Sequence, residues 1–584
     1  MAGKSDLVVA PPRWSSAFFG IAEQELEQHL EPLPERLSAF AESFQGQVSA
    51  LSGTGLAQAL RDYEEFFTPL QQGTVYAEAR LAADSADEGA RKLLDRCEEL
   101  WEMAATKAEF FEREFGELPE KAAGELLACP VLAQYRNHLR QVRAAAANSP
   151  SAEVATVLAQ LDPVAGWERH ARRLLDRVTV VDDGARLALG AALPVLYQAD
   201  RGRRNQRCAA ISAALAPEAD LRASALTELT RARLARQRLC GQAGWLSEEN
   251  ANNQLTGDEV SALLDAVGAR RELVHRYYTA KAALLGHPLT DADRYAPVSA
   301  SADELTWPEA VEVVLGAFAA LGPAVSAAAT DLIERGAVDA APGKGKRRGA
   351  LTFSAPGGHS CVLLTFTGTQ RDVLTLAHEL GHAVHAALSG RLGVLSFSPP
   401  TVLAETVALF AEAITMRHWL HQAGAAARPG LLARWLEDQL VTAFRQLSVH
   451  EFESTVHRAV AASEPPDADA LGDLWLSAQG ALYGPAVSLT PGYRLWWSYL
   501  DNLYFAPGTR YAYAFGQLAA TSLLARSEER DFGARFEALL RAGGGGSPAD
   551  LLGPLGFRPA EPDSWQSGLA ALEAQVGEFA VTVS

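Results

Sequence analysis

Apolar residues recur at intervals of three and four over the first half of the chain, from Ala17 to about Arg270. Leu26, Leu30, Leu33 and Leu37 show this spacing, which is typical of one face of an amphipathic helix. Turn-rich points interrupt the pattern at helix-sized intervals, and no repeat of fixed period is visible. We therefore expect this half to consist of packed helices.

A different pattern lies between Gly336 and Gly368. Two short apolar runs, Ala350–Phe353 and Ser360–Phe366, are separated by the turn Ala355–Gly358, and this arrangement predicts a pair of strands. Helical spacing then resumes, and the four glycines at 543–546 predict a flexible connector into the last helices. The fold class that we expect is mainly α, with a minor sheet near residues 350–366.

Composition and charge exclude several classes of protein. The 584 residues are 48% hydrophobic and 21% charged, which excludes a mostly disordered chain, and the net charge of −19 disfavours nucleic acids and anionic membranes as partners. No apolar run is as long as the roughly 18 residues of a membrane span. The five cysteines are widely spaced without a CxxC pair, and residues 1–14 do not resemble a signal peptide, so we expect a cytoplasmic protein.

The strongest motif lies in residues 372–388, where an apolar stripe at helical spacing predicts an amphipathic helix. On this helix His378 and His382 stand four residues apart, so both imidazoles can reach one metal ion, and Glu379 lies beside them. This is the HExxH pattern of a zinc site that carries its own general base. We expect one zinc ion per chain, although cobalt or manganese would suit the same donors.

A catalytic zinc site needs a third protein ligand. The tenth residue after His378 is Leu388, so the metzincin pattern fails. The next helix, opened by Pro399–Pro400, carries Glu405 and Glu412 seven residues apart on one face. We assign Glu405 as the ligand and Glu412 as the residue that holds a ligating histidine through its other ring nitrogen. His385 is either a further support of the site or a buried core histidine.

This set of residues predicts metal-assisted hydrolysis of an amide. Glu379 would take a proton from the attacking water and pass it to the leaving amine. The charge that develops on the carbonyl oxygen needs a second hydrogen-bond donor, and we expect it among Tyr504, Tyr511 and Tyr513.

The segment Thr365–His385 resembles the core of the oligoendopeptidase F branch of the thimet oligopeptidase family. Further similar stretches are Lys346–Ala350, Ala404–Glu412 and Tyr511–Gly516, and the resemblance extends over nearly the whole chain. It implies a two-lobed, clam-like helical metallopeptidase of the gluzincin type, with a deep channel and zinc on its floor. Residues 1–190 would then form a helical lid and substrate-channel domain, and residues 191–584 the catalytic domain.

The resemblance also implies roles for particular residues. It supports His378, His382 and Glu405 as ligands, and it suggests that the strand from Gly357 to Val362 pairs with the peptide backbone. The residues expected to bind substrate are Gly357, Gly358, His359, Ser360 and Tyr504. One departure concerns a histidine that the family uses to bind the reacting carbonyl. Asn502 is its best positional substitute here, because no histidine follows His457.

The leading interpretation is a zinc endopeptidase that cleaves internal bonds of short peptides. A carboxypeptidase that trims C-terminal residues in the same channel is the alternative among enzymes. A third interpretation, outside the enzymes, is a catalytically weak, zinc-containing peptide-binding protein, which the departure at Asn502 suggests. We expect a monomer or weak oligomer whose partners are short peptides.

Overall fold

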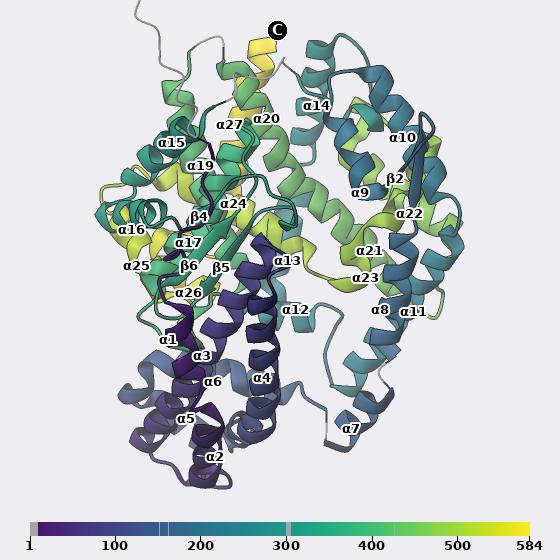
Figure 1. The fold of residues 1–584 in the computed structure, drawn as a ribbon. Helices are drawn as coiled ribbons and strands as arrows, with labels where there is room; N and C mark the ends of the chain where they lie inside the picture. Colours follow the sequence, from purple (N-terminus) through teal and green to yellow (C-terminus); the bar gives the residue numbers. More distant parts are fainter. Residues whose placement is uncertain (1–9, 151, 162, 299–304, 425–426, 584) are drawn as a thin grey trace, which may run out of the picture.

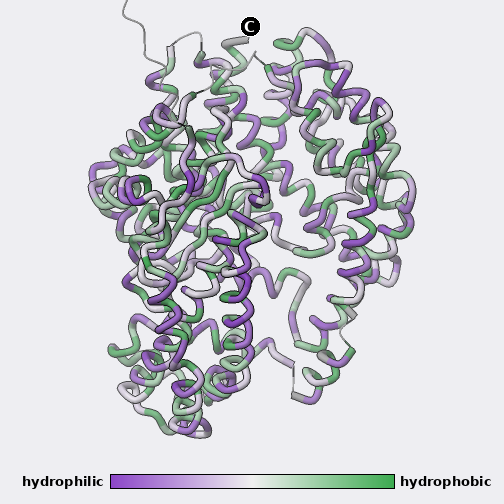
Figure 2. Tube along the Cα trace, in the orientation of Figure 1, coloured by the Kyte–Doolittle hydropathy of each residue, from purple (hydrophilic) through white to green (hydrophobic). Residues whose placement is uncertain are grey.

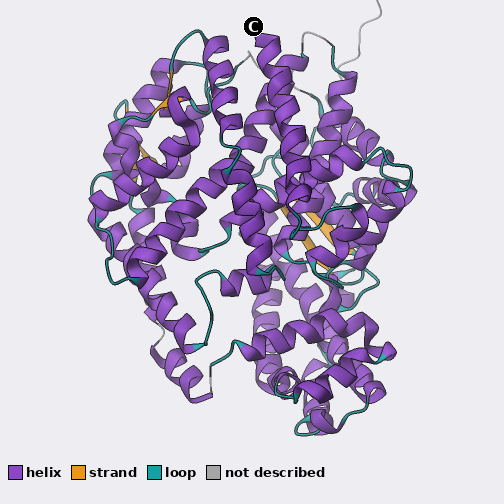
Figure 3. Ribbon diagram, turned by 180° about the vertical axis from the view of Figure 1, so that it is seen from behind, coloured by secondary structure: helices purple, strands orange, loops and turns teal. Residues whose placement is uncertain are grey.

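The computed structural model describes residues 10–150, 152–161, 163–298, 305–424 and 427–583. Helices dominate these residues, and the strands are few and short (Figures 1 and 3). Hydrophobic and hydrophilic residues alternate in short blocks along most helices, as in amphipathic helices packed on a core (Figure 2). The expected fold class, mainly α with a minor sheet, is therefore confirmed.

The elements follow one another along the chain in three groups. The N-terminal helices, in the lower part of Figure 1, are α1 (Glu23–Leu30), α2 (Leu33–Phe44), α3 (Gly53–Ala83), α4 (Glu88–Gly116), α5 (Glu120–Ala128) and α6 (Arg136–Ala147). The second group is α7 (Ala152–Leu161), α8 (Pro163–Asp176), β1 (Thr179–Asp182), β2 (Ala185–Ala188), α9 (Leu189–Ala192), α10 (Arg201–Leu215), α11 (Ala219–Leu239), α12 (Ser247–Asn252), α13 (Gly257–Gly268), α14 (Glu272–Leu285) and β3 (Leu289–Thr290). The third group is α15 (Trp307–Ala319), α16 (Pro323–Glu334), β4 (Val338–Asp339), β5 (Leu351–Ala355), β6 (His359–Leu363), α17 (Gln370–Ser389), α18 (Val394–Phe397), α19 (Thr401–Gln422), α20 (Arg428–Leu440), α21 (Gln446–Ala461), α22 (Ala468–Tyr483), β7 (Val487–Ser488), α23 (Asp501–Phe505), α24 (Arg510–Arg526), α25 (Phe532–Ala542), α26 (Pro548–Leu552) and α27 (Pro562–Val583).

Buried apolar side chains form two separate cores. The larger core joins the N-terminal helices to the central and C-terminal ones, including α17, α19, α24 and α27. The smaller core joins α8, α10 and α11 to α21 and α22, on the right of Figure 1. Each core contains residues from both sides of the domain boundary expected near residue 190. The lid role of residues 1–190 therefore stays a prediction.

One continuous rod contributes to both cores. It consists of α20, a π-helical turn at Val441–Arg445, and α21. Leu436 of α20 lies in the larger core and Phe452 of α21 in the smaller. The rod therefore ties the two cores together through its own backbone.

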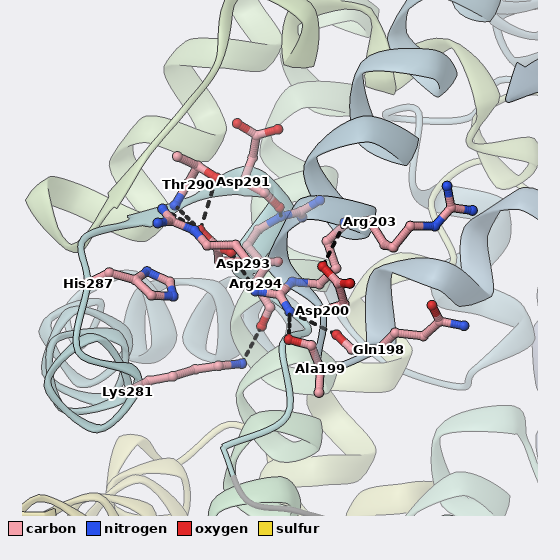
Figure 4. A network of polar contacts seen from close by, with 12 residues as sticks. Gln198, Ala199, Asp200, Arg203, Lys281, His287, Thr290, Asp291, Asp293 and Arg294 are labelled. Atoms are coloured by element: carbon pink, nitrogen blue, oxygen red, sulfur yellow. Dashed lines mark hydrogen bonds and ion pairs between the residues drawn. The ribbon is translucent and has the colours of Figure 1, made fainter. Parts of the chain in front are cut away.

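A buried polar network adds a second connection where the cores meet. Lys281 of α14 is fully buried, pairs with Glu437 of α20 and donates to the Arg294 carbonyl oxygen at 2.7 Å, toward which Figure 4 shows it pointing. Arg204 of α10 pairs with Asp293 at 2.7 Å. Because a buried charge without a partner is costly, these pairs fix how α10, α14 and α20 pack together.

The predicted strand pair is confirmed, and its neighbours decide which edge is free. β5 and β6 are antiparallel, with Leu351 opposite Leu363 and Ala355 opposite His359. β4 pairs with the other side of β6 in parallel, so the strand order is β4-β6-β5. β5 is consequently the edge strand next to α17, and β6 is the central one.

Two expectations about local structure were wrong. The stretch 179–188, expected within a helical region, is the hairpin β1–β2, whose turn residues Asp183 and Gly184 have φ of 49° and 76°. The glycines 543–546 are not a flexible connector. Gly544 N–H donates to the Ser396 carbonyl oxygen at 2.9 Å, and a Cβ on Gly544 would collide with a backbone carbonyl. These glycines allow two backbones to approach closely, which is a different use of the same residue.

Candidate active site

Helix α17 positions the predicted zinc motif. Thr369 caps its N-terminus by accepting a hydrogen bond from Asp372 N–H, and the Asp372 carboxylate accepts in return from Thr369 N–H. Val373, Leu376 and Leu380 lie on its fully buried face. His378 and His382 lie on the remaining face, with side chains 20% and 21% exposed, and point toward α19.

Three donors converge between α17 and α19. Nε2 of His378 lies 3.8 Å from Oε2 of Glu405, and Nε2 of His382 lies 3.9 Å from Oε1 of Glu405. Among the described residues, this is the one group of His, Cys, Asp or Glu whose donor atoms all lie within 4.8 Å of each other. Tetrahedral zinc with bonds of about 2.0–2.1 Å holds its donors about 3.4 Å apart, so a small closure of the side chains suffices. Two imidazoles and a carboxylate are a donor set that catalytic zinc uses, and the residues fit the ion.

Two glycines allow the helices that carry these donors to approach. A Cβ on Gly381 would lie 2.9 Å from the Cβ of Ala411 on α19, and one on Gly516 of α24 would lie 3.0 Å from the Cβ of Glu405. Real Cβ atoms do not come so close. Gly381 therefore sets the spacing of α17 and α19, and Gly516 lets α24 pack directly behind Glu405.

Glu412 holds the first histidine as the sequence predicted. Its Oε1 lies 2.6 Å from Nδ1 of His378, which leaves Nε2 free to face the other donors. Burial by itself lowers the pKa of His378, but the Glu412 and Glu405 carboxylates outweigh burial and raise the pKa to about 9. Burial and the neighbouring His378 hold the pKa of His382 well below its usual value.

Glu379 lies on the same helix turn and is oriented from the sheet. It is 8% exposed, and its Oε2 accepts a hydrogen bond from Thr352 Oγ of β5 at 2.7 Å. The same hydroxyl lies 2.9 Å from the Glu379 carbonyl oxygen. Burial raises the pKa of Glu379, while His378 and Thr352 act in the opposite direction. The result is a carboxylate of raised basicity fixed beside the three donors.

Residues 324–571 match the model of peptidase family M3. This segment, which is less than half of the chain, is thus similar to peptidase family M3. The matched segment contains the three donors and Glu379, so the family match covers the whole site described above.

The curated proteins that resemble this chain are named as oligopeptidases. The oligoendopeptidase F homolog of Lactococcus lactis subsp. lactis is 26% identical over 339 residues, which are 56% of this chain and 55% of that protein. Oligopeptidase PepF of Bacillus subtilis is 25% identical over 335 residues, which are 56% of this chain and 50% of that protein. The chain thus spans about half the length of the curated relatives it matches.

Solved structures share the fold along almost the whole chain. A candidate peptidase of Chlamydophila abortus has a TM-score of 0.86 at 21% identity, covering 97% of this chain and 98% of that one. Oligoendopeptidase-F from Enterococcus faecium has a TM-score of 0.70 at 20% identity, covering 95% and 98%. PZ peptidase A has a TM-score of 0.72 at 16% identity, covering 97% and 98%. The helical fold is therefore shared with these structures.

The donors and Glu379 open into a pocket of about 740 Å³. One wall is the edge strand, through Ala350, Leu351, Thr352 and Ser354, and Tyr513 of α24 also lines the pocket. His385 lies at its margin, 3% exposed, with an Nε2 that has no hydrogen-bond partner, and burial lowers the pKa of His385 to about 4.

The structure places a different strand beside the pocket from the one expected to pair with a peptide. β6 is the central strand, paired with β5 from His359 to Leu363 and with β4 at Val362 and Leu363, so the edge strand that lines the pocket is β5. Gly357 N–H donates to the Gly390 carbonyl oxygen, and Gly358 approaches the backbone of α17. His359 stacks on Phe19, and the fully buried Ser360 hydroxyl donates to the Ala383 carbonyl oxygen. None of these four lines the pocket.

Of the residues named for the carbonyl oxygen, only Tyr513 reaches the pocket. It is 37% exposed, and burial together with the nearby Glu405 raises its pKa. Tyr511 is fully buried with its hydroxyl 3.4 Å from Asn253, and Tyr504 is fully buried with its hydroxyl donating to the Ser498 carbonyl oxygen. Asn502 does not line the pocket either. Helical periodicity alone could have shown that Tyr511 and Tyr513 do not both face the pocket, since they lie about 200° apart around the helix.

Proposed function

We propose that the chain is a zinc-dependent endopeptidase that hydrolyses internal bonds of short oligopeptides. The observation that carries the proposal is the convergence of His378, His382 and Glu405 in one pocket with Glu379, beside an unpaired strand edge. A zinc ion held by the three donors would supply a Lewis acid that polarises a peptide carbonyl and lowers the pKa of water.

The residues of the chain would share the remaining work. A peptide lies extended along β5, whose free N–H and C=O groups pair with its backbone. The Glu379 carboxylate takes the proton of the attacking water and later delivers it to the leaving nitrogen, which balances the proton over the whole hydrolysis. The Tyr513 hydroxyl donates to the carbonyl oxygen as negative charge develops there.

Cleavage of an internally quenched peptide by zinc-loaded protein tests the proposal, with Glu379→Gln as the matched variant. Glu379→Gln keeps the three donors, so we expect zinc binding to persist while cleavage falls by at least about 10³-fold, the upper part of the range for general-base loss. Equal cleavage by both proteins would refute the role of Glu379. Tight peptide binding with no difference in turnover would favour the peptide-binding protein.

Product masses distinguish the carboxypeptidase from the endopeptidase. Incubation with peptides of mixed length should give internal fragments, whereas successive loss of single C-terminal residues would favour the carboxypeptidase. The free edge of β5 lines the pocket and can pair with peptide residues on both sides of the cut, which is why we favour internal cleavage.

We also propose a cytoplasmic protein that is monomeric or weakly associated. The five cysteines are free, which suits a reducing compartment. Among the described residues no helix has the length and apolar character of a membrane span. Cell fractionation and light scattering of the purified protein test these two points.

A further inference from the structure

A second cavity of about 470 Å³ lies beyond the N-terminal end of α17. Its wall combines elements of both cores. Tyr197 and Tyr295 come from the side of the smaller core, and Arg371 of α17 with Arg434 and Asp438 of α20 come from the larger one. We call it the arginine cavity. Sites for ligands are common at such junctions.

The arginine cavity lies along the same helices as the active site. Arg371 precedes His378 by seven residues on one face of α17, which is about 10.5 Å along the helix axis. Asp438 precedes Thr442 by one helical turn, and Thr442 lines the pocket that contains the zinc donors. The charge of Glu412, the carboxylate that holds His378, acts on Asp438. The two cavities therefore lie one after the other along α17 and along the rod of α20 and α21.

The arginine cavity carries unpaired positive charge. Among the described residues, neither Arg371 nor Arg434 has a carboxylate within ion-pair distance. The Glu437 carboxylate at the cavity wall already pairs with Lys281. Asp438 is the remaining acid; burial and Glu437 raise its pKa to about 7, which weakens its negative charge near neutral pH. Arg371 and Arg434 therefore share Asp438, and the Glu437 charge that acts on Arg434 is already paired with Lys281.

The opposite wall offers aromatic surface. The rings of Tyr197 and Tyr295 stack with their centroids 4.8 Å apart, and Tyr197 is 42% exposed. A guanidinium fork binds a carboxylate through two parallel hydrogen bonds. The cavity thus combines a carboxylate-binding wall with a wall that can pack against an apolar or aromatic side chain.

We propose that the arginine cavity binds the C-terminal carboxylate of a peptide substrate through Arg371 and Arg434, and so fixes how far from its C-terminus the peptide is cut. This inference rests on the proposed peptidase function. Arg371 and His378 are separated by about 10.5 Å along the axis of α17, and an extended chain advances about 3.3 Å per residue, so a peptide running alongside this helix would span the interval with about three residues. The enzyme would accordingly release C-terminal fragments of about three residues from short peptides.

Binding to the inactive Glu379→Gln protein, loaded with zinc, tests the proposal without requiring turnover. Four versions of one hexapeptide are compared: free at both ends, N-acetylated, C-amidated, and blocked at both ends. We expect C-amidation to weaken binding about 10- to 100-fold, the range for a hydrogen-bonded charge, and N-acetylation to have little effect. Adding Arg371→Gln or Arg434→Gln should abolish most of the amidation effect, whereas Arg458→Gln, an exposed arginine of α21 outside both cavities, should leave it intact.

The outcomes separate this inference from the proposed function. If N-acetylation weakens binding instead, or if the amidation effect persists in both arginine variants, the inference is overturned; absence of binding by every peptide overturns it as well. Failure of the proposed function has a different signature, in which the protein with Glu379 intact does not cleave a peptide that the inactive variant binds in a carboxylate-dependent way. Product masses give a second readout, because the cut should stay at a constant distance from the C-terminus and should scatter in Arg371→Gln.

Discussion

Replacing Gly381 by alanine should separate the two helices that supply the zinc donors. The added Cβ would lie 2.9 Å from the Cβ of Ala411 and 3.1 Å from the Cα of Ala408. Carbon atoms at optimal contact are about 3.5–4.0 Å apart, so α17 and α19 must separate by about 0.6–1.1 Å at this point. The donors of His378 and Glu405, now 3.8 Å apart, would then lie more than 4 Å from one another.

Two effects on stability oppose each other in Gly381→Ala. Overpacking a core typically costs about 1–3 kcal/mol, and the higher helix propensity of alanine returns about 1 kcal/mol. The expected net loss is thus about 0–2 kcal/mol, which leaves the protein folded. Zinc affinity is the sharper measure, and we expect it to fall at least tenfold, because one donor pair moves beyond the span of a tetrahedral ion.

A competition titration against a chromophoric zinc chelator measures the affinity, and urea unfolding of the metal-free protein measures the stability. Gly480→Ala is the matched control, since Gly480 lies within α22 with no atom within 4 Å of its added Cβ. That variant should gain up to about 1 kcal/mol and bind zinc normally. Wild-type zinc affinity in a folded Gly381→Ala protein would refute the argument that this glycine sets the donor spacing.

Three further substitutions test other parts of the structure. Tyr513→Phe should lower kcat by about 10²–10³-fold without changing zinc affinity, whereas Tyr511→Phe, whose hydroxyl lies outside the pocket, should not; equal effects would contradict the assignment. Lys281→Met leaves the buried Glu437 carboxylate unpaired and should destabilise the fold by about 3–5 kcal/mol in urea unfolding, and adding Glu437→Gln should recover part of that loss. Gly544→Ala should lower the free energy of unfolding by about 1–3 kcal/mol, whereas the same substitution in a flexible connector would have no such effect.

Local signals made the catalytic helices predictable. The helix predicted over 372–388 is observed as α17, Gln370–Ser389, and the helix predicted after Pro400 begins at Thr401 as α19. In both, the apolar stripe and the terminal residues lie within a few turns of each other, so no distant part of the chain is needed to define them. The spacing of Glu405 from Glu412 likewise places two carboxylates on one helix face.

The errors arose where distant segments decide the outcome. The two residues of β4 occupy one side of β6, and nothing in the sequence of β6 itself reveals that neighbour. The role of Gly544 likewise depends on the backbone at Ser396, about 150 residues away in the chain. The β1–β2 hairpin is different, because Asp183–Gly184 is a local turn signal that the helical spacing around it obscured.

The missing family histidine has less effect on the site than its absence from the sequence suggests. Its positional substitute, Asn502, lies outside the pocket, so the chain does not replace one donor by another at that point. Tyr513 is in the pocket, and the charge of Arg510, one helical turn earlier, acts on its hydroxyl and opposes the effect of burial on the pKa of Tyr513. Burial and Glu405 still raise the pKa of Tyr513 overall, so its hydroxyl keeps its proton and can donate to a developing oxyanion. The peptidase and the weak peptide-binding protein therefore differ mainly in whether the Tyr513 hydroxyl alone stabilises the oxyanion well enough for turnover. The kcat of Tyr513→Phe answers this question.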